Sequence, residues 1–63
     1  MEARLVLIED AAAAVGYSVQ LVERLCEEGI VSNEREFDIL RVDLNELRAY
    51  KRDIDALMRG EES

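Results

Sequence analysis

Apolar and polar positions divide the chain into short segments with different periods. Residues 4–8 are apolar except for Arg4 and partly β-branched, and they are too few for a helix, so they predict a strand or an extended lead-in. An alanine-rich stretch follows from residue 11 to residue 15, and Glu9 and Asp10 stand where acids favour the positive end of a helix dipole. We therefore predict a first helix that ends at Gly16.

A second helix is predicted from Ser18, a good N-cap, to about Glu28. Its apolar positions follow an i, i+1, i+4, i+5 pattern, at Leu21, Val22, Leu25 and Cys26. The next residue, Gly29, suits the left-handed position that closes a helix.

Residues 32–35 are polar and predict a turn, whereas residues 36–42 are rich in strand formers, so we expect a short β-hairpin or a single strand. Asp43 can cap a third helix, and Glu46 three residues later completes a pattern resembling a capping box. Apolar residues then recur at spacings of three and four up to Gly60, at Leu44, Leu47, Tyr50, Ile54 and Leu57.

The predicted fold is therefore mainly α with a small β wing, with three helices and short strands. A chain of 63 residues allows one small domain, which we place at residues 1–60, followed by a frayed acidic tail at residues 61–63. The order of two short helices, a wing-like segment and a further helix is that of a winged helix-turn-helix.

Composition narrows the functional classes. No apolar run approaches the roughly 20 residues that span a bilayer, and the start lacks the pattern of a signal peptide, so we expect a cytoplasmic protein with no membrane contact. The chain has no histidine, and its one cysteine, Cys26, has no partner for an internal disulfide. We predict no metal, no cofactor and no enzymatic activity.

Several short motifs occur in a recognisable order. They read IEDAA at residues 8–12, VGYS at 15–18, VERL at 22–25, GIV at 29–31, and then Asp43-Leu44 with Leu47 and Ala49-Tyr50. Together they resemble the MerR and excisionase-like helix-turn-helix families over residues 5–50, which is most of the chain. One departure is Leu7, which stands where those families place a capping residue.

The resemblance implies a small regulatory DNA-binding protein of a phage or bacterium, either a transcriptional regulator or an excisionase. In such proteins the second helix enters the major groove and the wing touches the backbone or the minor groove. The matching positions here are Ser18, Gln20, Arg24, Arg35 and Arg41. Arg24 could equally form an ion pair with Glu27 or Glu28 on its own helix.

Charge favours a second interpretation. The net charge is −7, and residues 19–36 carry five acids against two bases, which is opposite to what phosphate contacts require. Acidic relatives such as the chaperone-modulator family are similar in using this scaffold to bind protein. The alternative function is therefore a protein-binding modulator, namely an antirepressor, a DNA mimic or a chaperone-modulator-like inhibitor. Its acidic surface would comprise Glu23, Glu27, Glu28 and Glu34 and would engage a basic partner.

The third helix carries a further candidate surface. Its apolar residues exceed what so small a core can cover, and an uncovered stripe with Tyr50, Ile54 and Met58 favours a homodimer or partner docking. Basic residues interleave with acids on the same helix, which is typical of a solvated mixed-charge face.

Overall fold

The computed structural model describes residues 4–60, so the predicted tail at residues 61–63 lies outside it. The described chain forms an α+β domain with three helices and a three-stranded antiparallel sheet of order β1-β3-β2. The elements are β1 Leu5–Leu7, α1 Ile8–Val15, α2 Val19–Glu27, β2 Asn33–Glu36, β3 Ile39–Asp43 and α3 Leu44–Met58. The predicted number and order of helices are confirmed.

Local sequence explains how α1 and α2 are joined. Gly16 adopts a φ of 78°, a left-handed conformation open to glycine, and its N–H donates to the carbonyl of Ala12 at 2.8 Å. The Ser18 hydroxyl then accepts a hydrogen bond from the backbone N–H of Leu21 at 3.1 Å, which confirms it as the N-cap of α2. At the start of α1, Leu7 supplies no such bond.

The hairpin is confirmed, but the predicted position of its turn is wrong. Residues 33–36, of which 33–35 belong to the expected polar turn, form β2, and the chain reverses at Phe37 and Asp38, near the start of the expected strand. Both turn residues have positive φ, at 51° and 67°, as a type I′ turn requires. All four β2 side chains are exposed, so this edge strand lacks the apolar alternation that marks a strand in a sequence.

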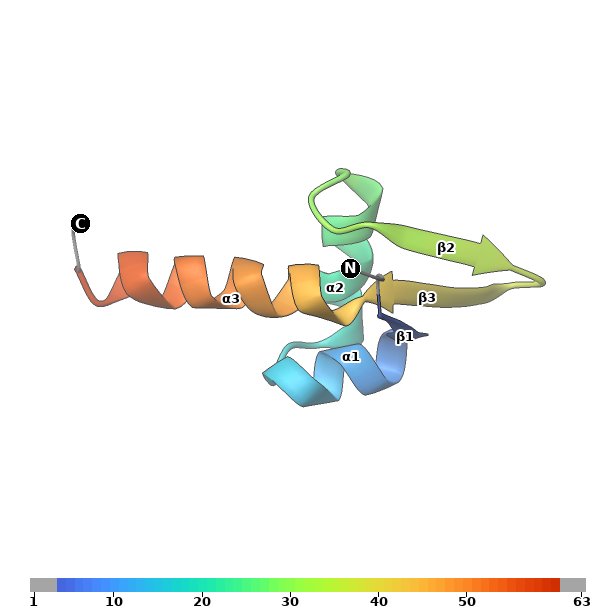
Figure 1. The fold of residues 1–63 in the computed structure, drawn as a ribbon, viewed down its shortest axis with the longest axis horizontal. Coiled ribbons are helices and arrows are strands. Elements are labelled where there is room, and N and C mark those ends of the chain that lie inside the picture. Colours follow the sequence, from blue (N-terminus) through green and yellow to red (C-terminus); the bar gives the residue numbers. More distant parts are fainter. Residues whose placement is uncertain (1–3, 61–63) are drawn as a thin grey trace.

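The hydrophobic core lies where the three helices meet β3 (Figure 1). Its largest fully buried side chains are Leu47, Val22, Val31 and Val42. Alternation along β3 sends Leu40 and Val42 into this core and leaves Arg41 exposed on the other face of the sheet, and Ile39, the first residue of the strand, is also exposed. Alanines at positions 11 and 12 allow α1 to pack closely, and both are almost completely buried.

The capping box predicted at the start of α3 forms only in part. Asp43 Oδ1 accepts from the Glu46 N–H at 3.1 Å, as predicted, but the Glu46 carboxylate does not return the bond. It accepts instead from the N–H and the hydroxyl of Ser32, at 2.7 and 3.0 Å, while the Asp43 N–H donates to the Ser32 carbonyl at 2.9 Å. Glu46 therefore ties the segment after α2 to the start of α3.

The domain is elongated, with extents of 42 × 27 × 20 Å. The β2–β3 hairpin projects at one end of the long axis, and the second half of α3 projects at the other, beyond the packed body (Figure 1). Within residues 4–60, none of the helices combines the length and the apolar character that crossing a membrane requires.

Candidate functional site

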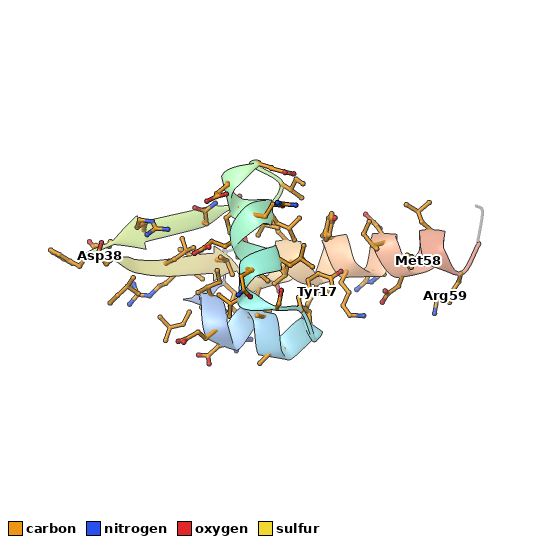
Figure 2. The ribbon with its side chains drawn as sticks, turned by 180° about the vertical axis from the view of Figure 1, so that it is seen from behind. Tyr17, Asp38, Met58 and Arg59 are labelled. Carbon is orange, nitrogen blue, oxygen red and sulfur yellow. The ribbon has the colours of Figure 1, made fainter. Side chains whose placement is uncertain are left out.

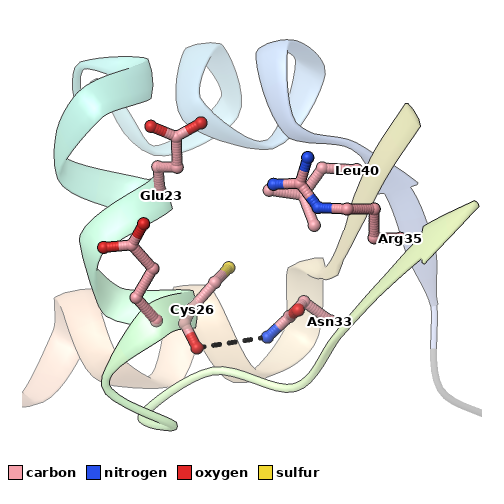
Figure 3. Close-up of a pocket in the computed structure, with 6 residues that line it drawn as sticks. Glu23, Cys26, Asn33, Arg35 and Leu40 are labelled. Atoms are coloured by element: carbon pink, nitrogen blue, oxygen red, sulfur yellow. Dashed lines mark hydrogen bonds between the residues drawn. The ribbon is translucent and has the colours of Figure 1, made fainter. Parts of the chain in front are cut away.

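A groove runs between the N-terminal ends of α1 and α2 on one side and the hairpin on the other. Its main hollow has a volume of ≈ 460 Å³. The hollow is lined by Leu7, Ile8, Glu9, Val19, Glu23, Arg35, Asp38, Ile39 and Leu40. A smaller hollow of ≈ 150 Å³ adjoins it and shares Glu23, Arg35 and Leu40 (Figure 3). We call the two together the α2–hairpin groove.

The register of the hairpin decides which side chains reach this groove. Arg35 pairs with Leu40, and because Leu40 faces the core, Arg35 lies on the same side of the sheet and points toward α2 (Figure 3). Asn33, two residues earlier, faces the same way, and its side-chain amide donates to the carbonyls of Cys26 and Val31 at 3.4 and 3.0 Å. These bonds hold the base of the hairpin against the end of α2.

The groove combines an apolar floor with an acidic rim. Three large apolar side chains of the floor remain partly exposed to solvent, at 41% for Leu7, 37% for Val19 and 45% for Ile39. The rim and the adjoining hollow carry four carboxylates, from Glu9, Glu23, Glu27 and Asp38, against the one guanidinium of Arg35. Across the part of the chain that the structure describes, Arg35 forms no ion pair. The groove therefore has a net negative charge.

Cys26 lies at the edge of the smaller hollow as a free thiol. Burial, followed by the nearby carboxylates of Glu23 and Glu27, raises the pKa of this thiol. The thiolate is therefore disfavoured, and the environment is opposite to that of a reactive cysteine. Among residues 4–60 no cluster of three or more acids or cysteines is arranged to hold a metal ion.

The structure does not gather the five predicted DNA contacts on one surface. The Ser18 hydroxyl is engaged as the cap of α2. Gln20 and Arg24 are exposed one turn apart on α2, and Arg24 makes no ion pair with any residue of the described range. Arg35 faces α2, whereas Arg41 lies on the opposite face of the sheet.

The four predicted acidic contacts are also divided. Glu23 and Glu27 line the smaller hollow together, and Glu28 is exposed at the C-cap of α2. Glu34 pairs with Arg41 on the far face of the hairpin, an opposite-charge cross-strand pair outside the groove. Sequence reasoning thus identified two of the acids that share a surface and missed Glu9 and Asp38.

The α3 residues that were predicted to form an uncovered apolar stripe differ in exposure, and they are more exposed the farther they lie from the packed body of the domain. Tyr50 packs against the core, and Ile54 is half-buried. Met58 and Leu57 are 82% and 71% exposed at the far end of the helix. The structure adds Phe37, an aromatic residue 90% exposed at the hairpin tip, which sequence reasoning placed inside a strand.

Comparison of this chain with family models, with curated proteins and with solved structures gives no match.

Proposed function

We propose that this domain is a protein-binding module built on a winged helix-turn-helix scaffold. In this proposal, α1, the Gly16 turn and α2 form the helix-turn-helix, and the β2–β3 hairpin is the wing. The α2–hairpin groove takes up a segment of another protein that combines apolar side chains with Lys or Arg. Such a segment would cover the exposed floor and neutralise the acidic rim.

The observation that carries this proposal is the charge of the groove around its apolar floor. A surface between a helix and a wing that binds DNA would present basic side chains, Lys or Arg, to the phosphates. Here the same place presents four carboxylates and one guanidinium, and the hairpin ends in Phe37 and Asp38 without a basic residue. A cationic, partly apolar peptide complements both features, whereas a polyphosphate complements neither.

A narrower observation supports the DNA-binding alternative. Gln20 and Arg24 project from α2 one turn apart and are exposed, so an amide and a guanidinium are available to base edges or phosphates. Glu23 and Glu27 lie on the same helix and would approach the phosphates as well. DNA binding is therefore the second candidate function, and the titration described next tests it with a DNA duplex.

The test is a titration of the isotope-labelled protein with a helical peptide of Leu and Lys, followed by backbone NMR shifts. A peptide of the same pattern with Glu in place of Lys and a mixed-sequence DNA duplex serve as comparison ligands. We expect the Leu/Lys peptide to shift signals of Leu7, Val19, Arg35 and Ile39, and its affinity to fall as salt rises because the exposed charges are screened.

Two variants that make the same charge change sharpen this test. Glu23→Gln removes a carboxylate from the groove, and Glu28→Gln removes one from the end of α2 outside it. We expect Glu23→Gln to weaken peptide binding several-fold and Glu28→Gln to leave it nearly unchanged. Equal effects of the two variants, or shifts with the DNA duplex alone, would overturn the proposal.

A further inference from the structure

Arg35 lies where the two hollows of the α2–hairpin groove meet. Three residues line both hollows and so mark this junction, namely Glu23, Arg35 and Leu40. On one side of the junction, Glu27 lines the smaller hollow only. On the other side, the main hollow extends to Glu9 in the first turn of α1 and to Asp38 at the tip of the hairpin (Figure 2). The groove therefore has an inner end at Glu27, a junction, and an outer end at Glu9 and Asp38.

The charge of the groove changes along this order. The inner end carries the carboxylate of Glu27, and the outer end carries those of Glu9 and Asp38. At the junction, the Arg35 guanidinium lies across the smaller hollow from the Glu23 carboxylate, so their formal charges cancel (Figure 3). Within residues 4–60, none of these five groups forms an ion pair. Two acidic ends are therefore separated by a neutral junction.

The inner end has the polar atoms that a basic side chain needs. Glu23 and Glu27 lie one turn apart on α2, a spacing at which two like charges destabilise a helix unless a cation lies between them. The side-chain nitrogen of Asn33 donates to the carbonyls of Cys26 and Val31, which leaves the side-chain oxygen of Asn33 as an acceptor at the same hollow. A Lys or Arg side chain supplies donors to all three oxygen-bearing groups.

The outer end combines its acids with the apolar floor. The partly exposed side chains of this floor belong to Leu7, Val19 and Ile39, and they line the main hollow only. Glu9 and Asp38 stand at the rim of the same hollow. An apolar side chain on the floor therefore leaves both carboxylates available to a second basic residue of the same segment.

We propose that Arg35 determines the order of side chains that the groove accepts, which is two basic residues, one for each acidic end, separated by uncharged apolar residues. A basic residue at the junction would meet the Arg35 guanidinium, and an acidic one would meet Glu23, so both are disfavoured there. This inference rests on the proposed function. It adds that the partner is recognised by the spacing of its basic residues and not only by their number.

The experiment compares peptides of one composition by isothermal titration calorimetry. Each contains two Lys in a background of Leu and Gln, and the Lys residues are adjacent or up to about six residues apart, which covers roughly 20 Å in an extended chain. Net charge and apolar content are constant, so only the spacing varies. We expect the adjacent pair to bind about three- to fivefold more weakly than the best separated pair, as suits partly exposed charges.

Three variants show whether Arg35 causes the preference. Arg35→Gln should bind the whole series more tightly and lose the preference for separated Lys residues, whereas Arg35→Lys keeps the charge and should keep the preference. Arg41→Gln makes the same charge change on the far face of the hairpin and should also keep it. Because Arg35 is exposed and forms no ion pair in the described chain, Arg35→Gln should retain the circular dichroism spectrum of the natural protein.

The possible failures are distinguishable. If the peptides bind the natural chain equally well, or if the preference persists in Arg35→Gln, this inference is overturned while the groove keeps its proposed function. If no peptide of the series binds, the proposed function is overturned and this inference with it.

Discussion

The contact between Glu46 and Ser32 can be distinguished from an ordinary capping box by mutation. The Glu46 carboxylate accepts two hydrogen bonds from Ser32, at 2.7 Å from its N–H and 3.0 Å from its hydroxyl. In a capping box the same carboxylate would accept from the Asp43 N–H, which here donates to the Ser32 carbonyl. The two arrangements couple Glu46 to different residues.

The expected magnitude follows from the kind of bond and its exposure. A hydrogen bond to a charged group contributes about 1.5–3 kcal/mol when it is well shielded. Ser32 and Glu46 are both exposed, so we take about 1 kcal/mol for each bond, and an acid in the first turn of a helix adds roughly 0.3–1 kcal/mol. Glu46→Ala should therefore lower the free energy of unfolding by about 2–3 kcal/mol. A domain of this length has about 3–9 kcal/mol in total.

A double-mutant cycle with urea unfolding followed by circular dichroism tests this. Ser32→Ala removes the hydroxyl bond and should cost about 1 kcal/mol, and combining it with Glu46→Ala should cost about 1 kcal/mol less than the sum. Asp43→Ala, which removes the N-cap, serves as the comparison and should cost about 0.5–2 kcal/mol without showing the same coupling to Ser32→Ala. If the Ser32 and Glu46 changes add to within about 0.3 kcal/mol, the carboxylate does not hold the loop.

Three further predictions follow from single residues. Gly16→Ala should lower stability by about 1–2 kcal/mol in thermal melts through its φ of 78° alone, because nothing lies within 4 Å of the added Cβ; an unchanged melting point would contradict the assigned turn. Leu47→Ala, at a fully buried position, should cost about 2–5 kcal/mol and leave little cooperative unfolding, and a mild effect in the same melts would place Leu47 outside the core. Burial holds the pKa of Cys26 above its usual value, so its stabilising contribution should be lost as pH rises through that raised pKa. Alkylation at pH 8 should accordingly be slower in the folded than in the urea-unfolded chain, and equal rates would contradict this.

Helix boundaries could be predicted from the sequence because their signals are local. Ser18 and Asp43 cap their helices through their own side chains, and Gly16 and Gly29 adopt the left-handed conformation that ends a helix. The hairpin turn could not be predicted in the same way. Phe37 carries no turn signal, Asp38 alone is a weak one, and the exposed residues of β2 carry no strand signal, so pairing with β3 decides both.

The candidate groove depends on the same pairing. Side chains alternate across a sheet, so the register that sets Arg35 opposite Leu40 sends Arg35 and Asn33 toward α2 and Glu34 and Glu36 away from it. A shift of one residue would reverse this and line the groove with two more acids. The sequence identified the charged residues of the hairpin but not the face of the sheet on which each one lies. The turn sets which residues of an edge strand face the core, and the position of this turn was not predicted. The turn at Phe37 and Asp38 therefore controls the charge of the groove, and a residue inserted into that turn should disturb peptide binding.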